Sequence, residues 1–192
     1  MTTNTPERPR ALVVFESMFG NTAAVANAVG RGLGLGGFAV DLVEVSDAEE
    51  SLPAEVQLLV VGAPTHAFSL SRPSTRADAV RQGAPAERAA VGVREWLSAC
   101  RVGVAAPQIA VFDTRVSKVR WLPKAAGPSA ARAGRRRGLE TFAKPLGFVV
   151  DDVRGPLVDH ELERAVEWGR HLAVALGDRA AATAPVRSPG LS

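Results

Sequence analysis

The chain has 192 residues, the size of one ordinary domain. Apolar residues make up 46% and charged residues 22%, which excludes collagen-like, coiled-coil and wholly disordered chains. The net charge of +3 conceals an uneven distribution, because residues 1–60 carry 3 basic against 8 acidic side chains whereas residues 61–150 carry 15 against 5. This basic middle section indicates a partner of negative charge, which could be a nucleic acid, an acidic protein or an anionic small molecule.

Hydropathy and cysteine content indicate the compartment. Apolar runs such as 58–61 are far shorter than the roughly 20 residues of a membrane helix. Residues 1–10 are polar and lack the apolar core of a secretory signal. Cys100 is the single cysteine, which agrees with a reducing compartment. We therefore expect a cytoplasmic protein that does not bind membranes.

Short apolar segments alternate with segments of helical periodicity. In chain order, the expected strands are 11–15, 38–45, 56–61, 109–112 and 148–150, and the expected helices are 22–33, 88–100, 130–144 and 159–176. Strands one, three and four are almost wholly apolar and should be central, whereas strand two contains Asp41 and Glu44 and should lie at an edge.

This alternation predicts an α/β fold with three layers. Its five-stranded parallel sheet should have the order 2-1-3-4-5, with helices on both faces. Residues 11–177 should form this single domain, between a flexible N-terminus (1–10) and a flexible C-terminal tail (178–192).

Sheets of this order bind ligands at the carboxyl ends of strands one, three and four. The first loop there, 16–22, offers the hydroxyls of Ser17 and Thr22, the Asn21 amide and a flexible Gly20 at the start of a helix. Backbone N–H groups at a helix N-terminus attract a phosphate dianion. The alternative is an ordinary strand-to-helix turn with a polar cap.

The second and third loops offer groups suited to a flat conjugated ligand. Residues 62–68 combine a rigid proline, the His66 ring and the Phe68 ring, and the third loop opens on Asp113 and later contains Trp121. His66 could change charge near neutral pH beside such a ligand, or it could serve only as a hydrogen-bonding loop residue.

These segments resemble the flavodoxin family over residues 10–177. The resemblance rests on loops 17–22 and 62–68, on segment 112–115 and on the 155–157 turn before the last helix. It implies FMN as the cofactor. The residues that would hold the phosphate are Ser17, Met18, Phe19, Gly20, Asn21 and Thr22, and those beside the ring are Pro64, Thr65, His66, Ala67, Phe68, Asp113, Thr114, Arg115 and Val116.

The resemblance implies a redox protein that passes electrons through the exposed edge of its flavin, without a catalytic side chain. A second interpretation is an NAD(P)H-dependent quinone or flavin reductase, in which Arg72, Arg76, Arg115 or Lys118 receives the nucleotide. The family usually has Ser or Thr in place of Phe19, and the chain has no tyrosine to flank a flavin. These two departures keep open a third interpretation, a regulatory or binding module that has lost FMN.

The partner expected for this protein follows from the charge of the flavin loops. Cations on these loops are Arg72, Arg76, Arg115, Lys118, Arg120 and Lys124. We therefore expect an acidic redox-partner protein or an anionic small molecule. The 135–137 arginine run has no interleaved aromatic residue, so nucleic acid is not expected. No metal is expected, because the histidines and Cys100 lack ligand spacing.

Overall fold

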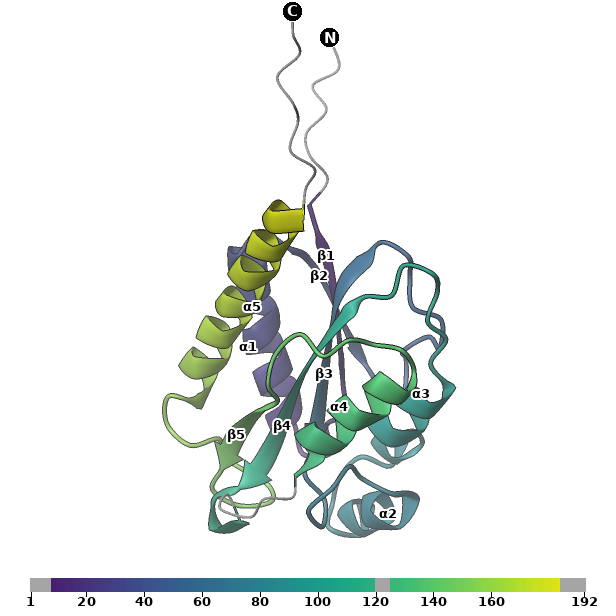
Figure 1. Ribbon diagram of the computed structural model, residues 1–192. Helices are drawn as coiled ribbons and strands as arrows, with labels where there is room; N and C mark the ends of the chain where they lie inside the picture. Colours follow the sequence, from purple (N-terminus) through teal and green to yellow (C-terminus); the bar gives the residue numbers. More distant parts are fainter. Residues whose placement is uncertain (1–7, 120–124, 184–192) are drawn as a thin grey trace, which may run out of the picture.

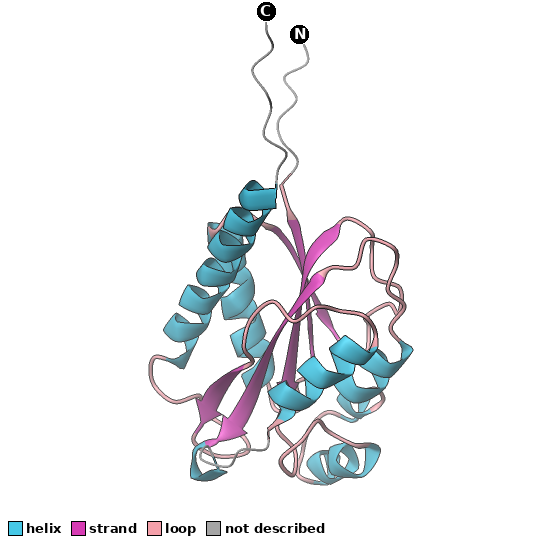
Figure 2. Cartoon of the chain, in the orientation of Figure 1, coloured by secondary structure: helices cyan, strands magenta, loops and turns pink. Residues whose placement is uncertain are grey.

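The computed structural model describes residues 8–119 and 125–183, which fold into a parallel sheet between two layers of helices (Figure 1, Figure 2). The strands are β1 (Arg10–Phe15), β2 (Ala39–Glu44), β3 (Val56–Pro64), β4 (Gln108–Val116) and β5 (Leu146–Val150). The helices are α1 (Asn21–Leu35), α2 (Pro73–Arg81), α3 (Val93–Ala99), α4 (Ala126–Arg136) and α5 (Glu161–Thr183), with short 3-10 turns η1 (Ala86–Ala89) and η2 (Ser117–Val119). The observed order, β2-β1-β3-β4-β5, confirms the predicted fold class.

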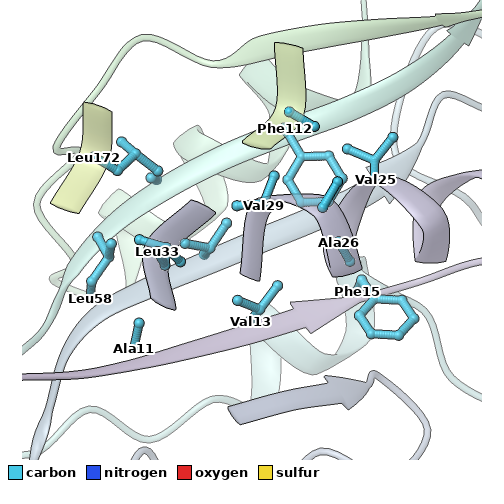
Figure 3. Packing of buried hydrophobic residues seen from close by; sticks show 14 of the residues in the cluster. Ala11, Val13, Phe15, Val25, Ala26, Val29, Leu33, Leu58, Phe112 and Leu172 are labelled. Atoms are coloured by element: carbon cyan, nitrogen blue, oxygen red, sulfur yellow. The ribbon is translucent and has the colours of Figure 1, made fainter. Parts of the chain in front are cut away.

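Each face of the sheet carries its own hydrophobic core. Helices α1 and α5 cover one face, where Val13, Leu58 and Phe112 are fully buried (Figure 3). Helices α3 and α4 cover the other face, over Val61 and Ile109. Successive side chains of a strand point to opposite faces, so the uninterrupted apolar runs of β1, β3 and β4 supply both cores.

The backbones of α1 and α5 touch through two glycines. A Cβ atom on Gly32 would lie 2.0 Å from the carbonyl oxygen of Val166, and one on Gly169 would lie 2.3 Å from that of Val29. Any larger residue at either position would push the helices apart. This contact fixes α1, and therefore the loop that precedes it, against the rest of the domain.

Two predicted helices were placed wrongly. The helix expected at 130–144 is α4, which ends at Arg136 because Gly138 adopts φ +84° and turns the chain. The following residues extend the sheet edge instead, since Ile109 N donates to Glu140 O at 2.8 Å and Phe142 N donates to Ile109 O at 2.8 Å. The helix expected at 88–100 is divided into η1 and α3.

Helix α2 was not predicted at all, because only Arg76 and Ala79 within it are buried and its apolar pattern is weak. Helix α5 continues to Thr183, so residues 178–183 are helical and not part of a tail. The remainder of the predicted tail and residues 1–7 lie outside the described residues. Within the described ranges, no helix is both long and apolar enough to cross a membrane.

Candidate functional site

A pocket of about 280 Å³ lies at the carboxyl ends of β1, β3 and β4, the lower end of the molecule in Figure 1. Its walls include every predicted site residue except Gly20, Phe68 and Asp113, and comprise Ser17, Met18, Phe19, Asn21, Thr22, Pro64, Thr65, His66, Ala67, Thr114, Arg115 and Val116. The sequence did not predict the rest of the pocket lining. It consists of Thr75, Asp78 and Ala79 in α2, Gln82 just after α2, Val150 at the end of β5 and Val153 beyond that strand. The three predicted loops therefore meet at one cavity.

One end of this pocket is formed by the N-terminus of α1 and by the loop 16–20 before it. Gly20, with φ +91°, is the N-cap residue of α1, and as a glycine it has no side chain that could cap the helix. The first turn contains no acidic residue, and Ser17 Oγ accepts a hydrogen bond from Ala23 N at 3.1 Å. The hydroxyls of Thr22 and Thr114 are 2.8 Å apart and join this loop to β4. A helix N-terminus without a carboxylate is suited to an anion.

The buried carboxylate of Asp113 organises the opposite wall. It accepts hydrogen bonds from Nε and Nη2 of Arg115, both at 2.7 Å, and from Gly127 N at 3.1 Å. Thr65 Oγ1 donates to it at 3.3 Å and accepts from Ala126 N at 3.0 Å. Asp113 is fully buried and does not line the pocket, so it positions wall residues and is not placed to contact a ligand.

The second loop makes a tight turn at residues 66–69. His66 N donates to Ser69 O at 2.9 Å, and Ser69 N donates to His66 O at 3.0 Å. The two central residues, Ala67 and Phe68, have φ of +45° and +64°. Turns of this kind normally use glycine or asparagine, because a Cβ atom is strained there. The turn directs Phe68 outward, 45% exposed, and leaves Ala67 in the pocket wall.

His66 is held neutral at this site. Burial lowers the pKa of its imidazole from 6.5, and the positive charge of Arg76 lowers the pKa further. The ring therefore offers one N–H donor and one acceptor at neutral pH.

Arg76 does not face the pocket as the sequence suggested. Its guanidinium is 1% exposed and donates to Ser71 Oγ at 3.0 Å and to Glu95 Oε2 at 3.1 Å. The Glu16 carboxylate lies in the same cluster and accepts from Val93 N at 3.0 Å. Burial raises the pKa of Glu16, and the nearby Arg76 charge partly opposes that rise. These charges tie the start of the phosphate loop to α2 and α3.

Fewer of the cations predicted on the flavin loops are free and exposed than the sequence suggested. Arg76 is buried, and Arg115 is paired with Asp113 and only 19% exposed. Arg72 and Lys118 are exposed. Arg120, Trp121 and Lys124 lie outside the described residues. In the parts of the chain that the structure describes, no group of three or more His, Cys, Asp or Glu residues could hold a metal ion.

Comparison with known proteins agrees with the geometry. Residues 13–81 match the family model described as flavodoxin. No curated protein matches the chain. A flavodoxin from the domain Archaea is 18% identical, with a TM-score of 0.61 over 88% of this chain and 99% of that one. The flavodoxin of Streptococcus pneumonia TIGR4 is 19% identical, with a TM-score of 0.58 over 88% and 99%. At these identities the two structures show a shared fold.

The sheet order and a pocket at its switch point define a flavodoxin-like α/β protein. The match to the flavodoxin family model covers the segment from β1 to α2, and this likeness implies FMN as the cofactor. The residues present fit this group. The N-terminus of α1, which has no acidic residue in its first turn, suits the phosphate, and the walls from 64–67 and 114–116 offer backbone polar groups and apolar surface for the ring.

Proposed function

We propose that this protein is an electron carrier that uses FMN to pass electrons to and from a redox partner at the exposed edge of the flavin. Bound FMN would supply the redox chemistry, by accepting and releasing electrons at its isoalloxazine ring. Residues 17–22 would hold the phosphate, and residues 64–67 and 114–116 would hold the ring. The protein would contribute binding, orientation and electrostatic environment, without a nucleophile.

This proposal rests on how two of the arginines suggested for the nucleotide, Arg76 and Arg115, are bonded. A reductase needs cations that are free to receive the phosphates of NAD(P)H. Arg76 is enclosed by Ser71 and Glu95. Arg115 commits two of its five N–H donors to Asp113, and that carboxylate balances its charge. Two of the four cations suggested for the nucleotide are therefore already engaged, which favours the carrier over the reductase.

The pocket walls would act on the ring in two ways. Neutral His66 can donate or accept one hydrogen bond without adding charge beside the flavin. Arg115 presents a fixed positive charge in the opposite wall, because Asp113 orients it and a Cβ atom on Gly147 would lie only 2.5 Å from its Nη2.

We further propose that the redox partner is acidic, or that an anionic small molecule exchanges the electrons. The exposed Arg72 lies three residues before Thr75 of the pocket wall, and the exposed Lys118 lies two residues after Val116, which supports a positive rim. Attraction between such a rim and an anion would accelerate encounter and would weaken with added salt.

A spectroscopic experiment tests the carrier. The purified apoprotein is mixed with FMN, and flavin fluorescence and the visible spectrum report uptake. Anaerobic NADPH is then added, followed by dithionite. Uptake of FMN with bleaching by dithionite alone supports the carrier, and rapid bleaching by NADPH would replace it with the reductase. Failure of FMN to bind would support the binding-module interpretation.

Two small oxidants of opposite charge test whether the rim formed by Arg72 and Lys118 is positively charged. Reduced protein is mixed with ferricyanide, an anion, or with hexaammineruthenium(III), a cation. We expect the ferricyanide rate to fall with ionic strength, and to fall further in Lys118→Gln and Arg72→Gln. Arg136→Gln, which removes an exposed charge at the far end of α4, is the matched control. Equal salt dependence for both oxidants would refute the rim.

A further inference from the structure

Helix α3 lies outside the pocket, yet one of its side chains holds the loop that forms the pocket wall. Arg94 Nε donates to Ser71 O at 3.0 Å, and Arg94 Nη2 donates to Leu70 O at 2.8 Å and to Ser69 Oγ at 3.2 Å. These acceptors are three consecutive residues. They begin at the last residue of the 66–69 turn, so the guanidinium fixes the chain where it leaves the turn.

The chain needs this anchor because the turn is strained. Ala67 and Phe68 both occupy the left-handed region, where a residue with a Cβ atom is strained. The turn's own two backbone hydrogen bonds join His66 to Ser69. A partner outside the turn that fixes Ser69 therefore also fixes the strained pair.

Burial adds a second reason. Leu70 and Ser71 are 2% and 0% exposed, so water does not readily replace a lost donor at their carbonyl oxygens. The forked guanidinium satisfies both carbonyls and the hydroxyl at once, which a lysine with its single nitrogen could not do in the same geometry. In the described parts of the chain no carboxylate pairs with Arg94, and the side-chain donors of Arg94 bond to this loop.

We propose that Arg94 is a positioning residue for the flavin: it holds the strained 66–69 turn in the shape that places His66 and Ala67 in the pocket wall. This inference rests on FMN binding at the pocket. Without Arg94 the turn would relax out of the left-handed region, and the wall beside the ring would lose its shape before any ligand arrived.

The first test measures the turn without flavin. Amide hydrogen exchange of apoprotein reports the His66 and Ser69 N–H groups, whose bonds close the turn. We expect Arg94→Gln to speed exchange at Ser69 by about tenfold or more, in proportion to the lost hydrogen bonds. Arg137→Gln is the matched control, because Arg137 also donates twice to a backbone carbonyl, that of Cys100, on the other end of the domain. Unchanged exchange in Arg94→Gln would overturn the proposal.

The second test measures FMN affinity by fluorescence titration. We expect Arg94→Gln to raise the dissociation constant about tenfold, Arg94→Lys to fall between it and the unaltered protein, and Arg137→Gln to change it less than about twofold. Failure of the unaltered protein to bind FMN would remove the functional role, while hydrogen exchange would still decide whether Arg94 holds the turn.

The decisive variant removes the strain instead of the anchor. Glycine adopts the left-handed region freely, so Ala67→Gly should lessen the need for Arg94. Measured against Ala67→Gly alone, the double variant should lose several-fold less FMN affinity than Arg94→Gln loses against the unaltered protein. A merely structural role for Arg94 predicts that the two substitutions act independently. Additive effects would overturn the proposal.

Discussion

The substitution Asp113→Asn tests whether a buried charge organises the flavin site. The Asp113 side chain is fully buried, with 0% exposure, and it accepts two charge-assisted hydrogen bonds from Arg115 at 2.7 Å. An asparagine keeps the shape and can still accept from Gly127 N. It presents an NH₂ group to the guanidinium in place of one oxygen, so the pair is broken and the Arg115 charge loses its partner.

The expected loss follows from burial. Removing one member of a buried ion pair costs about 3–5 kcal/mol. Arg115 retains 19% exposure, so water stabilises part of its charge. We therefore expect a loss of stability at the lower end of this range, about 3 kcal/mol. The matched control is Asp41→Asn, which breaks the Arg10–Asp41 pair at 2.6 Å, where the two side chains are 40% and 49% exposed. Exposed pairs of this kind contribute about 0–1 kcal/mol.

Urea unfolding of the two apoproteins measures both losses. The comparison is valid where the urea slopes agree, because the slope reports the surface exposed on unfolding. We expect Asp113→Asn to lower the free energy of unfolding by at least about 2 kcal/mol more than Asp41→Asn does. A difference below about 1 kcal/mol would refute the conclusion that Asp113 and Arg115 form a structural pair.

Three further predictions concern pH and the phosphate loop. Burial raises the pKa of Glu16 above 4.5 in the folded protein. The free energy of unfolding should therefore fall as the pH rises from 4.5 through the pKa of the folded state. Glu16→Gln should flatten this pH dependence, measured as the urea midpoint at each pH. The lowered pKa of His66 predicts stability that is lost as pH falls below 6.5, with an imidazole NMR titration midpoint below 6.5; a midpoint above 6.5 would contradict this. Gly155→Ala should weaken FMN binding several-fold, because φ is +96° and its Cβ would lie 2.6 Å from Asn21 Oδ1, whereas Gly138→Ala, at φ +84° in open space, should lower stability alone.

Sequence patterns alone predicted the sheet and pointed to loop 17–22 as part of the pocket. Wholly apolar runs mark strands buried on both faces, and Asp41 with Glu44 mark an edge, so the order 2-1-3-4-5 followed. The 17–22 loop was recognisable because its hydroxyl, amide and glycine residues are contiguous and lie directly between a strand and a helix. Features of this kind are local, and residues that act together lie next to one another in the chain.

The tertiary structure decided which charges face the pocket. Arg76 and Arg115 have the same charge in the sequence, but Arg76 is enclosed with Glu95, 19 positions away, and Arg115 is oriented by Asp113 in the opposite wall. Helix α2 and the anchor Arg94 were missed for the same reason: a mostly exposed helix has little apolar periodicity, and the acceptors of Arg94 lie 23 to 25 positions away. Local propensity and hydrophobic period determined where this chain forms strands and helices, whereas only the packing of those elements determined which polar groups meet.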